Sequence, residues 1–186
     1  MKGAFDIELL RQRLRSVASL ESDQELPKAA VAIILDPNRE GGSVLLIKRK
    51  ERKGDPWSGQ IAFPGGHRSR NDRTCLETAI REASEEVGIG LREGELLGNL
   101  PFMYSRTRLV LVAPFVFLVT RHSVISLNDE VTASFWIPLD VLSKMMATKR
   151  EVEDEGRRLA VDSYVYGEHV IWGLTFRIIN ELLNRK

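Results

Sequence analysis

Short continuous runs of apolar residues alternate along the chain with segments whose apolar residues recur every three or four positions. A continuous run of strand length that ends at turn-forming residues predicts a β-strand, and the wider spacing predicts an amphipathic helix. The runs predict strands over 29–35, 44–47, 61–63, 96–104, 109–120, 134–137 and 159–166. The spacing predicts helices over 6–18, 74–87, 138–146 and 171–183, and residues 151–158 are expected to form a charged loop or hairpin.

The predicted elements are mixed along the chain without a strict strand–helix–strand alternation. This order favours an α+β class with a mixed-sheet sandwich over a doubly wound parallel sheet. The length of 186 residues suits one domain, and no internal repeat or low-complexity tract interrupts it. We therefore expect residues 1–186 to form a single domain that begins with the helix at about 6–18.

The overall composition narrows the classes of function. The net charge is +1 with 28% charged residues, so the totals give no strongly basic face for a nucleic-acid polymer. The longest apolar run, 109–119, is of strand length and contains Pro114, so it is too short to cross a bilayer. Cys75 stands alone, and the start lacks the apolar stretch of a signal peptide. We expect a cytoplasmic protein without membrane partners.

Three carboxylates lie close together within the predicted helix 74–87, at Glu82, Glu85 and Glu86. Positions i, i+3 and i+4 of a helix share one face, where like charges repel each other. A divalent cation cancels this repulsion, and carboxylate oxygens favour Mg²⁺, Mn²⁺ or Ca²⁺ over softer metals. Clustered glutamates are also typical of a solvated surface, where Arg81 could pair with Glu77 or Glu85. The triplet alone leaves both interpretations open.

The surrounding residues extend the pattern. The order is Phe63-Pro64-Gly65-Gly66, a polar loop, a helix, and then Arg81-Glu82-Ala83-Ser84-Glu85-Glu86-Val87-Gly88-Ile89. This order resembles the signature of the Nudix hydrolases. The resemblance implies an α/β/α sandwich around a mixed sheet, with the signature as a catalytic loop–helix–loop. It also implies metal-dependent hydrolysis of a nucleotide diphosphate.

Further segments are similar to the coenzyme A diphosphatase branch of that family. They are 45–49, 58–66, 100–101, 130–131, 135–139 and 171–175. The chain departs from these patterns in three places. Between Arg49 and Gly59 it has one extra residue, with Lys50 in place of a small residue, and the segment 104–109 also differs from the branch. The third departure is from the general signature, where only Asp72 stands near the place of a glutamate. The first two departures lie in predicted specificity loops.

The resemblance assigns candidate roles to the acidic and glycine residues. Glu82 and Glu86 are the expected metal ligands, with Glu85 as a third, and the Gly66 backbone can add a carbonyl oxygen because glycine permits a close approach. The expected ion is Mg²⁺ or Mn²⁺, which polarises phosphoryl oxygens and activates water. Arg81 either orients the carboxylates or contacts phosphate, and the family favours orientation. Glu130 is a candidate base with Glu82 as its rival, although it could simply solvate a turn.

Substrate contacts are expected from a second set of residues. Cationic candidates for the phosphates, each of which could instead belong to a solvated charged segment, are Arg49, Arg52, Lys53, Arg106 and Arg108. Trp57 can stack on an adenine or anchor a loop, and His67 can touch phosphate or lie idle in its loop. Trp136 and Trp172 are assigned to packing, and Cys75 to a small core position.

Three functions follow in order of preference. The first is hydrolysis of coenzyme A or an acyl-CoA to phosphopantetheine and an adenosine bisphosphate. The second keeps the chemistry but takes ADP-ribose, another nucleotide-linked diphosphate or a nucleoside triphosphate. The third is a Nudix-fold module that senses a small-molecule nucleotide without cleaving it, which intact carboxylates disfavour. A homodimer is left open.

Overall fold

The computed structural model describes residues 6–15, 27–55, 57–105, 109–120, 124–154 and 156–185. The strands are β1 (Ala29–Asp36), β2 (Ser43–Arg49), β3 (Ile61–Ala62), β4 (Gly65–His67), β5 (Glu95–Asn99), β6 (Met103–Tyr104), β7 (Leu111–Leu118), β8 (Val131–Pro138), β9 (Thr148–Asp154), β10 (Arg157–Tyr166) and β11 (His169–Trp172). The helices are α1 (Ile7–Arg13), α2 (Cys75–Val87), α3 (Leu139–Lys144) and α4 (Gly173–Leu182), with a short 3₁₀ turn, η2 (Leu91–Glu93).

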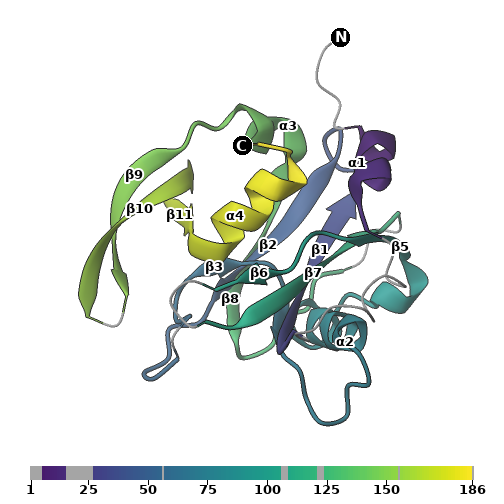
Figure 1. Ribbon diagram of the computed structural model, residues 1–186, viewed down its shortest axis with the longest axis horizontal. Coiled ribbons are helices and arrows are strands. Elements are labelled where there is room, and N and C mark those ends of the chain that lie inside the picture. Colours follow the sequence, from purple (N-terminus) through teal and green to yellow (C-terminus); the bar gives the residue numbers. More distant parts are fainter. Residues whose placement is uncertain are drawn as a thin grey trace.

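A mixed sheet forms the centre of the molecule. Its main path runs in the order β3-β2-β1-β7-β5, with β4 paired to β1, β6 to β7 and β8 to β2. The pairing of β1 with β7 is parallel, and those of β1 with β2 and β4 are antiparallel. A separate sheet, β11-β10-β9, forms the hairpin region beside it (Figure 1). The mixed sheet confirms the predicted α+β class.

The two faces of the central sheet bury different cores. Along β1, Ile33 and Leu35 pack on the face that Ile178 of α4 covers. The alternate residue Ile34 packs on the other face with Ala83 of α2. This alternation follows from the two-residue period of a strand. Figure 1 shows α4 and α2 on opposite sides of the sheet, which confirms the α/β/α sandwich. No helix within the described ranges is long and apolar enough to cross a membrane.

The first helix is shorter than predicted. Asp6 caps α1 as expected, but the helix ends at Arg13 and Leu14 is extended. The amide of Arg15 donates to the carbonyl of Asn99 at 3.0 Å, so the chain joins the edge of the sheet instead of continuing as a helix. Gly98 permits this approach, since a Cβ there would lie 2.7 Å from the Arg15 carbonyl oxygen. Residues 16–18 and 22–26 lie outside the described residues.

Tertiary pairing also moves other predicted boundaries. The single strand expected over 96–104 is divided into β5 and β6, because the Leu100 amide donates to the Pro114 carbonyl and Pro101 has no amide to continue the ladder. The last helix begins at Gly173, not at 171, because Ile171 and Trp172 pair with β10. Residues 151–154 and 157–158 belong to the β9–β10 hairpin, one of the two predicted forms.

Candidate active site

Helix α2 carries the clustered glutamates and is set by local signals at both ends. The Thr74 hydroxyl accepts from the Glu77 amide at the start, and Gly88 ends the helix with a φ of 72°. Ala79 and Ala83 are fully buried against the sheet. Small side chains on this face let the helix lie close to β1 and β4, so Glu82 and Glu86 come near the glycine pair.

Gly65 and Gly66 lie in β4 and pair with Val31 and Ala30 of β1. A Cβ at Gly65 would lie 2.4 Å from the Ala30 carbonyl oxygen, inside van der Waals contact. A Cβ at Gly66 would instead lie 2.5 Å from Oε1 of Glu82. The first glycine is therefore required by the sheet, and the second brings the main chain against a carboxylate of α2.

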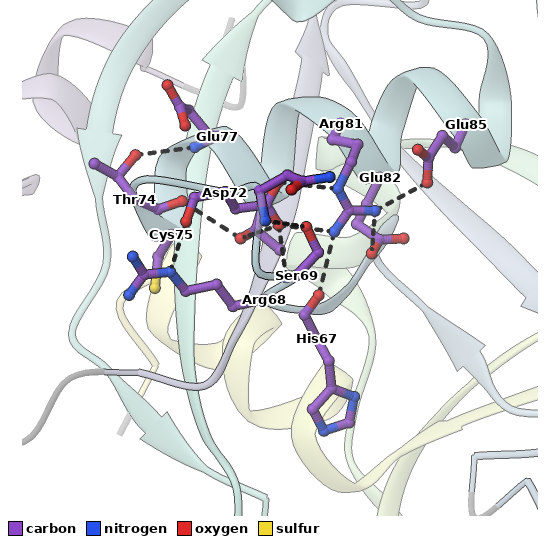
Figure 2. Close-up of polar contacts among 12 residues, drawn as sticks. His67, Arg68, Ser69, Asp72, Thr74, Cys75, Glu77, Arg81, Glu82 and Glu85 are labelled. Carbon is purple, nitrogen blue, oxygen red and sulfur yellow. Dashed lines mark hydrogen bonds and ion pairs between the residues drawn. The ribbon is translucent and has the colours of Figure 1, made fainter.

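Arg81 connects the polar loop to the acidic face of the helix. Its Nη1 lies 2.8 Å from Glu82 Oε1 and 2.9 Å from Glu85 Oε2. Its Nη2 also donates to the carbonyl oxygen of His67 at 3.2 Å. Figure 2 shows the guanidinium between Asp72 on one side and the two glutamates on the other, with the His67 ring directed away. Glu77, the other partner expected from the sequence, pairs with Arg73 at 2.6 Å.

Asp72 is buried beneath this arginine. Its carboxylate accepts two hydrogen bonds from Arg81 and others from the Ser69 amide and the Thr78 hydroxyl. These bonds, the one from Arg81 foremost, hold the pKa of Asp72 far below its usual range despite burial. The sequence pattern places Asp72 only near a signature glutamate and does not reveal that it holds Arg81. The signal available was an acid nine residues before the arginine, in the loop that leads into α2.

Glu86 is the most buried of the clustered acids, with 1% of its side chain exposed. Its Oε2 accepts from the Gly65 amide at 2.8 Å, and its Oε1 lies 3.4 Å from Nη1 of Arg49. Burial raises the pKa of Glu86 to about 7. The Gly65 amide and the Arg49 charge lower this pKa, while the charges of Glu82 and Glu130 raise it further. Burial likewise raises the pKa of Glu82, while Arg81 opposes the rise.

Glu130 enters the same electrostatic environment from the loop before β8. Its charge contributes to the raised pKa of both Glu82 and Glu86. Asn128 fixes this loop, because its amide donates to the Glu86 carbonyl at 3.3 Å and its side chain accepts from the Glu130 amide at 2.9 Å. The Glu130 carboxylate lies 3.1 Å from Arg52, which also donates to the Asp129 carbonyl.

A cavity of about 130 Å³ opens beside the glycine pair. Three of the predicted substrate-binding residues border it: Arg49, Trp57 and His67. The rings of Trp57 and His67 lie 5.4 Å apart and are tilted by 50°. The other side of the cavity is formed by apolar side chains of β1, β7 and α4, including Val31, Val112 and Ile178. The cavity thus joins charged, aromatic and aliphatic surfaces, and Arg49 and Gly66 connect it to the acidic residues of α2.

The NUDIX domain model matches residues 25–159, which is most of the chain and includes the glycine pair, the acidic helix α2 and Glu130. The chain belongs to the Nudix family. The Nudix hydrolase NudL of Pectobacterium atrosepticum is 34% identical over 181 residues, covering 94% of this chain and 90% of that protein. The NudL of Photorhabdus laumondii is 36% identical over 140 residues, covering 74% of each.

Solved structures agree with the Nudix fold. A MutT/nudix family protein from Enterococcus faecalis gives a TM-score of 0.54 at 20% identity, covering 97% of this chain and 74% of that one. The Ap4A hydrolase of C. elegans gives a TM-score of 0.53 at 19% identity, covering 62% of this chain and 83% of that one. The chain is a Nudix hydrolase, of the class that acts on nucleoside diphosphate-linked substrates and generally uses divalent metal ions.

The acidic residues of this Nudix site fit a hard cation in their chemistry. Glu82 and Glu86 are oxygen donors removed from water, their charges repel each other, and the Gly66 main chain lies against Glu82. In the part of the chain that the structure describes, however, no three His, Cys, Asp or Glu side chains converge closely enough to hold a metal ion. Glu82 and Glu85 face Arg81 and Glu86 faces Arg49, so these side chains must turn for a shared cation.

The remaining sequence candidates are distributed around the site. Arg52 faces Glu130, outside the set that borders the cavity, and Lys53 is exposed in the turn after β2. Arg106 and Arg108 lie outside the described residues. Two residues that the sequence assigned to packing contact the core under α2, Trp136 and Cys75. Trp136 also lies against the Arg39 guanidinium. Cys75 is half-buried, and its thiol is directed at the Pro27 carbonyl.

Proposed function

We propose that this Nudix hydrolase cleaves the diphosphate of coenzyme A or an acyl-CoA, giving phosphopantetheine and an adenosine bisphosphate. The segments 45–66 and 171–175, which resemble the coenzyme A diphosphatase branch, motivate this choice of substrate. The observation that carries it is the cavity beside Gly66, where Arg49 meets aromatic and aliphatic surfaces. Such a surface suits a substrate that combines phosphates, an adenine and a largely apolar arm.

The metal site in this proposal consists of Glu82, Glu85, Glu86 and the Gly66 carbonyl. A bound Mg²⁺ or Mn²⁺ would supply charge neutralisation for the phosphates and a lowered pKa for water. Arg81, held by Asp72, orients Glu82 and Glu85 beside the metal site.

Other residues then serve the reaction and the substrate. Glu130 accepts the proton of the attacking water, and its electrostatic coupling to Glu82 and Glu86 supports its presence in the site. Trp57 stacks on the adenine. The phosphates meet cationic and polar side chains on the cavity side, for which the candidates are Arg49, Arg52, Lys53, His67, Arg106 and Arg108.

A hydrolysis screen tests the proposal directly. Purified protein with Mg²⁺ or Mn²⁺ is supplied with coenzyme A, acetyl-CoA, ADP-ribose, NADH and nucleoside triphosphates, and the products are separated by chromatography. The expected result is the release of phosphopantetheine and an adenosine bisphosphate at the highest kcat/KM. Faster cleavage of ADP-ribose than of coenzyme A under the same conditions would replace this substrate with the second candidate.

A further inference from the structure

Arg49 lies at the end of β2, beside an irregularity in the pairing of β2 with β8. Lys48 pairs with Ala133 and Arg49 with Val131, so Thr132 is an extra residue that forms a bulge in β8. A bulge bends the strand that carries it, and bulges are common beside active sites. Beyond the bulge, the Lys50 amide donates to the Glu130 carbonyl at 2.8 Å. Arg49 projects toward α2 from a strand end that is tied to the loop of Glu130.

The guanidinium of Arg49 is shared between two acids. Nη2 lies 3.0 Å from Asp55 Oδ2, and Nη1 lies at the longer distance of 3.4 Å from Glu86 Oε1. Its buried Nε has no hydrogen-bond partner among the described residues. A buried donor without a partner costs free energy, so this arrangement leaves Arg49 capable of better contacts than it has.

Asp55 extends the connection to the cavity. Its Oδ1 accepts from the Trp57 amide at 2.9 Å, and this bond together with Arg49 lowers the pKa of Asp55 although burial opposes the change. Arg49 and Trp57 border the same cavity. One arginine thus links Glu86, a proposed metal ligand, to the loop that supplies an aromatic wall of the substrate cavity.

We propose that Arg49 is a positioning residue that couples cation binding to substrate binding. It acts as the counter-ion of Glu86 until a divalent cation takes over that charge, and its guanidinium then turns to a phosphate in the cavity. The inference rests on the proposed metal site but not on coenzyme A as the substrate. It requires that Arg49 both compete with the cation for Glu86 and contribute to substrate binding, and a purely structural ion pair would not do both.

Calorimetric titration with Mg²⁺ in the absence of substrate tests this competition. The pH is 9, well above the pKa of about 7 that burial gives Glu86. Removing a positive charge beside the acids strengthens cation binding, so Arg49→Gln is expected to bind Mg²⁺ about tenfold more tightly. Arg49→Lys keeps the charge and should stay within about threefold of the parent protein.

Asp55→Asn provides a test of opposite sign. Without Asp55, less of the Arg49 positive charge is neutralised and Arg49 is free to pair with Glu86 alone. Mg²⁺ binding is therefore expected to weaken several-fold. Arg39→Gln is the matched control, because Arg39 pairs with the buried Asp36 at 3.0 Å at the opposite end of β1 from the glycine pair. Its Mg²⁺ affinity should not change.

The directions of the two changes in Mg²⁺ affinity distinguish competition by Arg49 from a general loss of structure. A general loss of structure would weaken Mg²⁺ binding in both Arg49→Gln and Asp55→Asn, and that result overturns the proposal. An unchanged Mg²⁺ affinity in Arg49→Gln, or no Mg²⁺ binding by the parent protein, also overturns it. Circular dichroism checks that each variant is folded. Steady-state kinetics on whichever nucleotide is cleaved should show a raised KM for Arg49→Gln. If coenzyme A is not cleaved but the opposite signs are found, the proposed substrate fails and the coupling stands.

Discussion

Asp72 holds Arg81 through two hydrogen bonds, from Nε to Oδ1 at 3.1 Å and from Nη2 to Oδ2 at 2.9 Å. Asp72 comes from the loop and Arg81 from the helix, so this pair fixes the Nε and Nη2 atoms of Arg81. The remaining Nη1 is left to face Glu82 and Glu85. The orientation of the acidic face therefore depends on a residue that lies below it.

Replacing Asp72 with Asn should destabilise the protein as well as lower its activity. The change removes the charge from a buried acid and leaves the bonds from Arg81 weakened, which is expected to lower the free energy of unfolding by about 2 kcal/mol. Urea unfolding at pH 8 measures the loss. Asp140→Asn is the matched control, because Asp140 pairs with Lys144 on the surface and its replacement should change the stability little. Equal losses in the two variants would contradict the role given to Asp72.

The glycine pair should separate a structural effect from a catalytic one. Gly65→Ala places a methyl group against the backbone of Ala30, so we expect a loss of stability of about 2 kcal/mol. Gly66→Ala places it against the Glu82 carboxylate, which can turn away, so turnover should fall by about tenfold or more while the melting temperature stays near that of the parent. Gly90→Ala, where nothing lies within 4 Å of the added group, is the control. Normal turnover in Gly66→Ala would separate Glu82 from the reaction.

Glu82 and Glu86 should be essential for turnover. Exchange of either for Gln keeps the size of the side chain but removes a charged ligand, and the expected loss in kcat is about 10²-fold or more. Steady-state kinetics at saturating Mg²⁺, with circular dichroism as the check on folding, provides the measurement. Near-normal turnover in both variants would refute the proposed metal site.

Glu86 should make the metal-free protein less stable as the pH rises. Its folded-state pKa of about 7 lies above the ordinary value of 4.5, so its contribution to stability is fully present below pH 4.5 and is lost as the pH rises to about 7. The loss amounts to roughly 3 kcal/mol at most. Melting temperatures measured in EDTA between pH 5 and 8 should fall less for Glu86→Gln than for the parent. If the melting temperatures of the two proteins fell in parallel with pH, a buried Glu86 with a raised pKa would be ruled out.

Glu130→Gln should lower the maximal rate by about 10²-fold if Glu130 accepts a proton from water. Mg²⁺ affinity, measured by calorimetry, should change little because Glu130 is not among the proposed ligands. Arg52→Gln removes the partner that lies 3.1 Å from Glu130 and serves as a comparison, since it leaves the acid in place. Unaltered turnover of Glu130→Gln across the pH range would leave Glu82 as the candidate base.

The sequence predicts the local parts of the site well, because short-range chemistry determines them. Thr74 and Gly88 bound helix α2 through their own capping geometry, and the apolar runs give most strands of the sheet. Both faces of β1 are buried, which suits its continuous apolar run. These features depend on neighbours within a few positions, where propensity and periodicity act.

Contacts between distant segments could not be predicted in the same way. Arg49 and Glu86 are 37 positions apart, and only the folded β2–α2 arrangement brings them together. The early end of α1 has the same origin, since Arg15 leaves the helix to bond with Asn99. The pairing of each glutamate with an arginine is likewise a tertiary effect, and the helical spacing alone suggested acids that face one another.

The pairing of β4 with β1 has a consequence for how such a site can diversify. Hydrogen bonds from Ala32 to the Pro64 carbonyl and from Arg68 to the Lys28 carbonyl secure both ends of the glycine segment. This segment cannot be reshaped without disturbing the middle of the sheet. The loop between β2 and β3 is attached mainly through the ion pairs Arg49–Asp55 and Arg52–Glu130 and a hydrogen bond from the Lys50 amide. Substitutions at exposed positions that spare these contacts, such as Lys53, can change which nucleotides are accepted while the hydrolytic residues stay where they are.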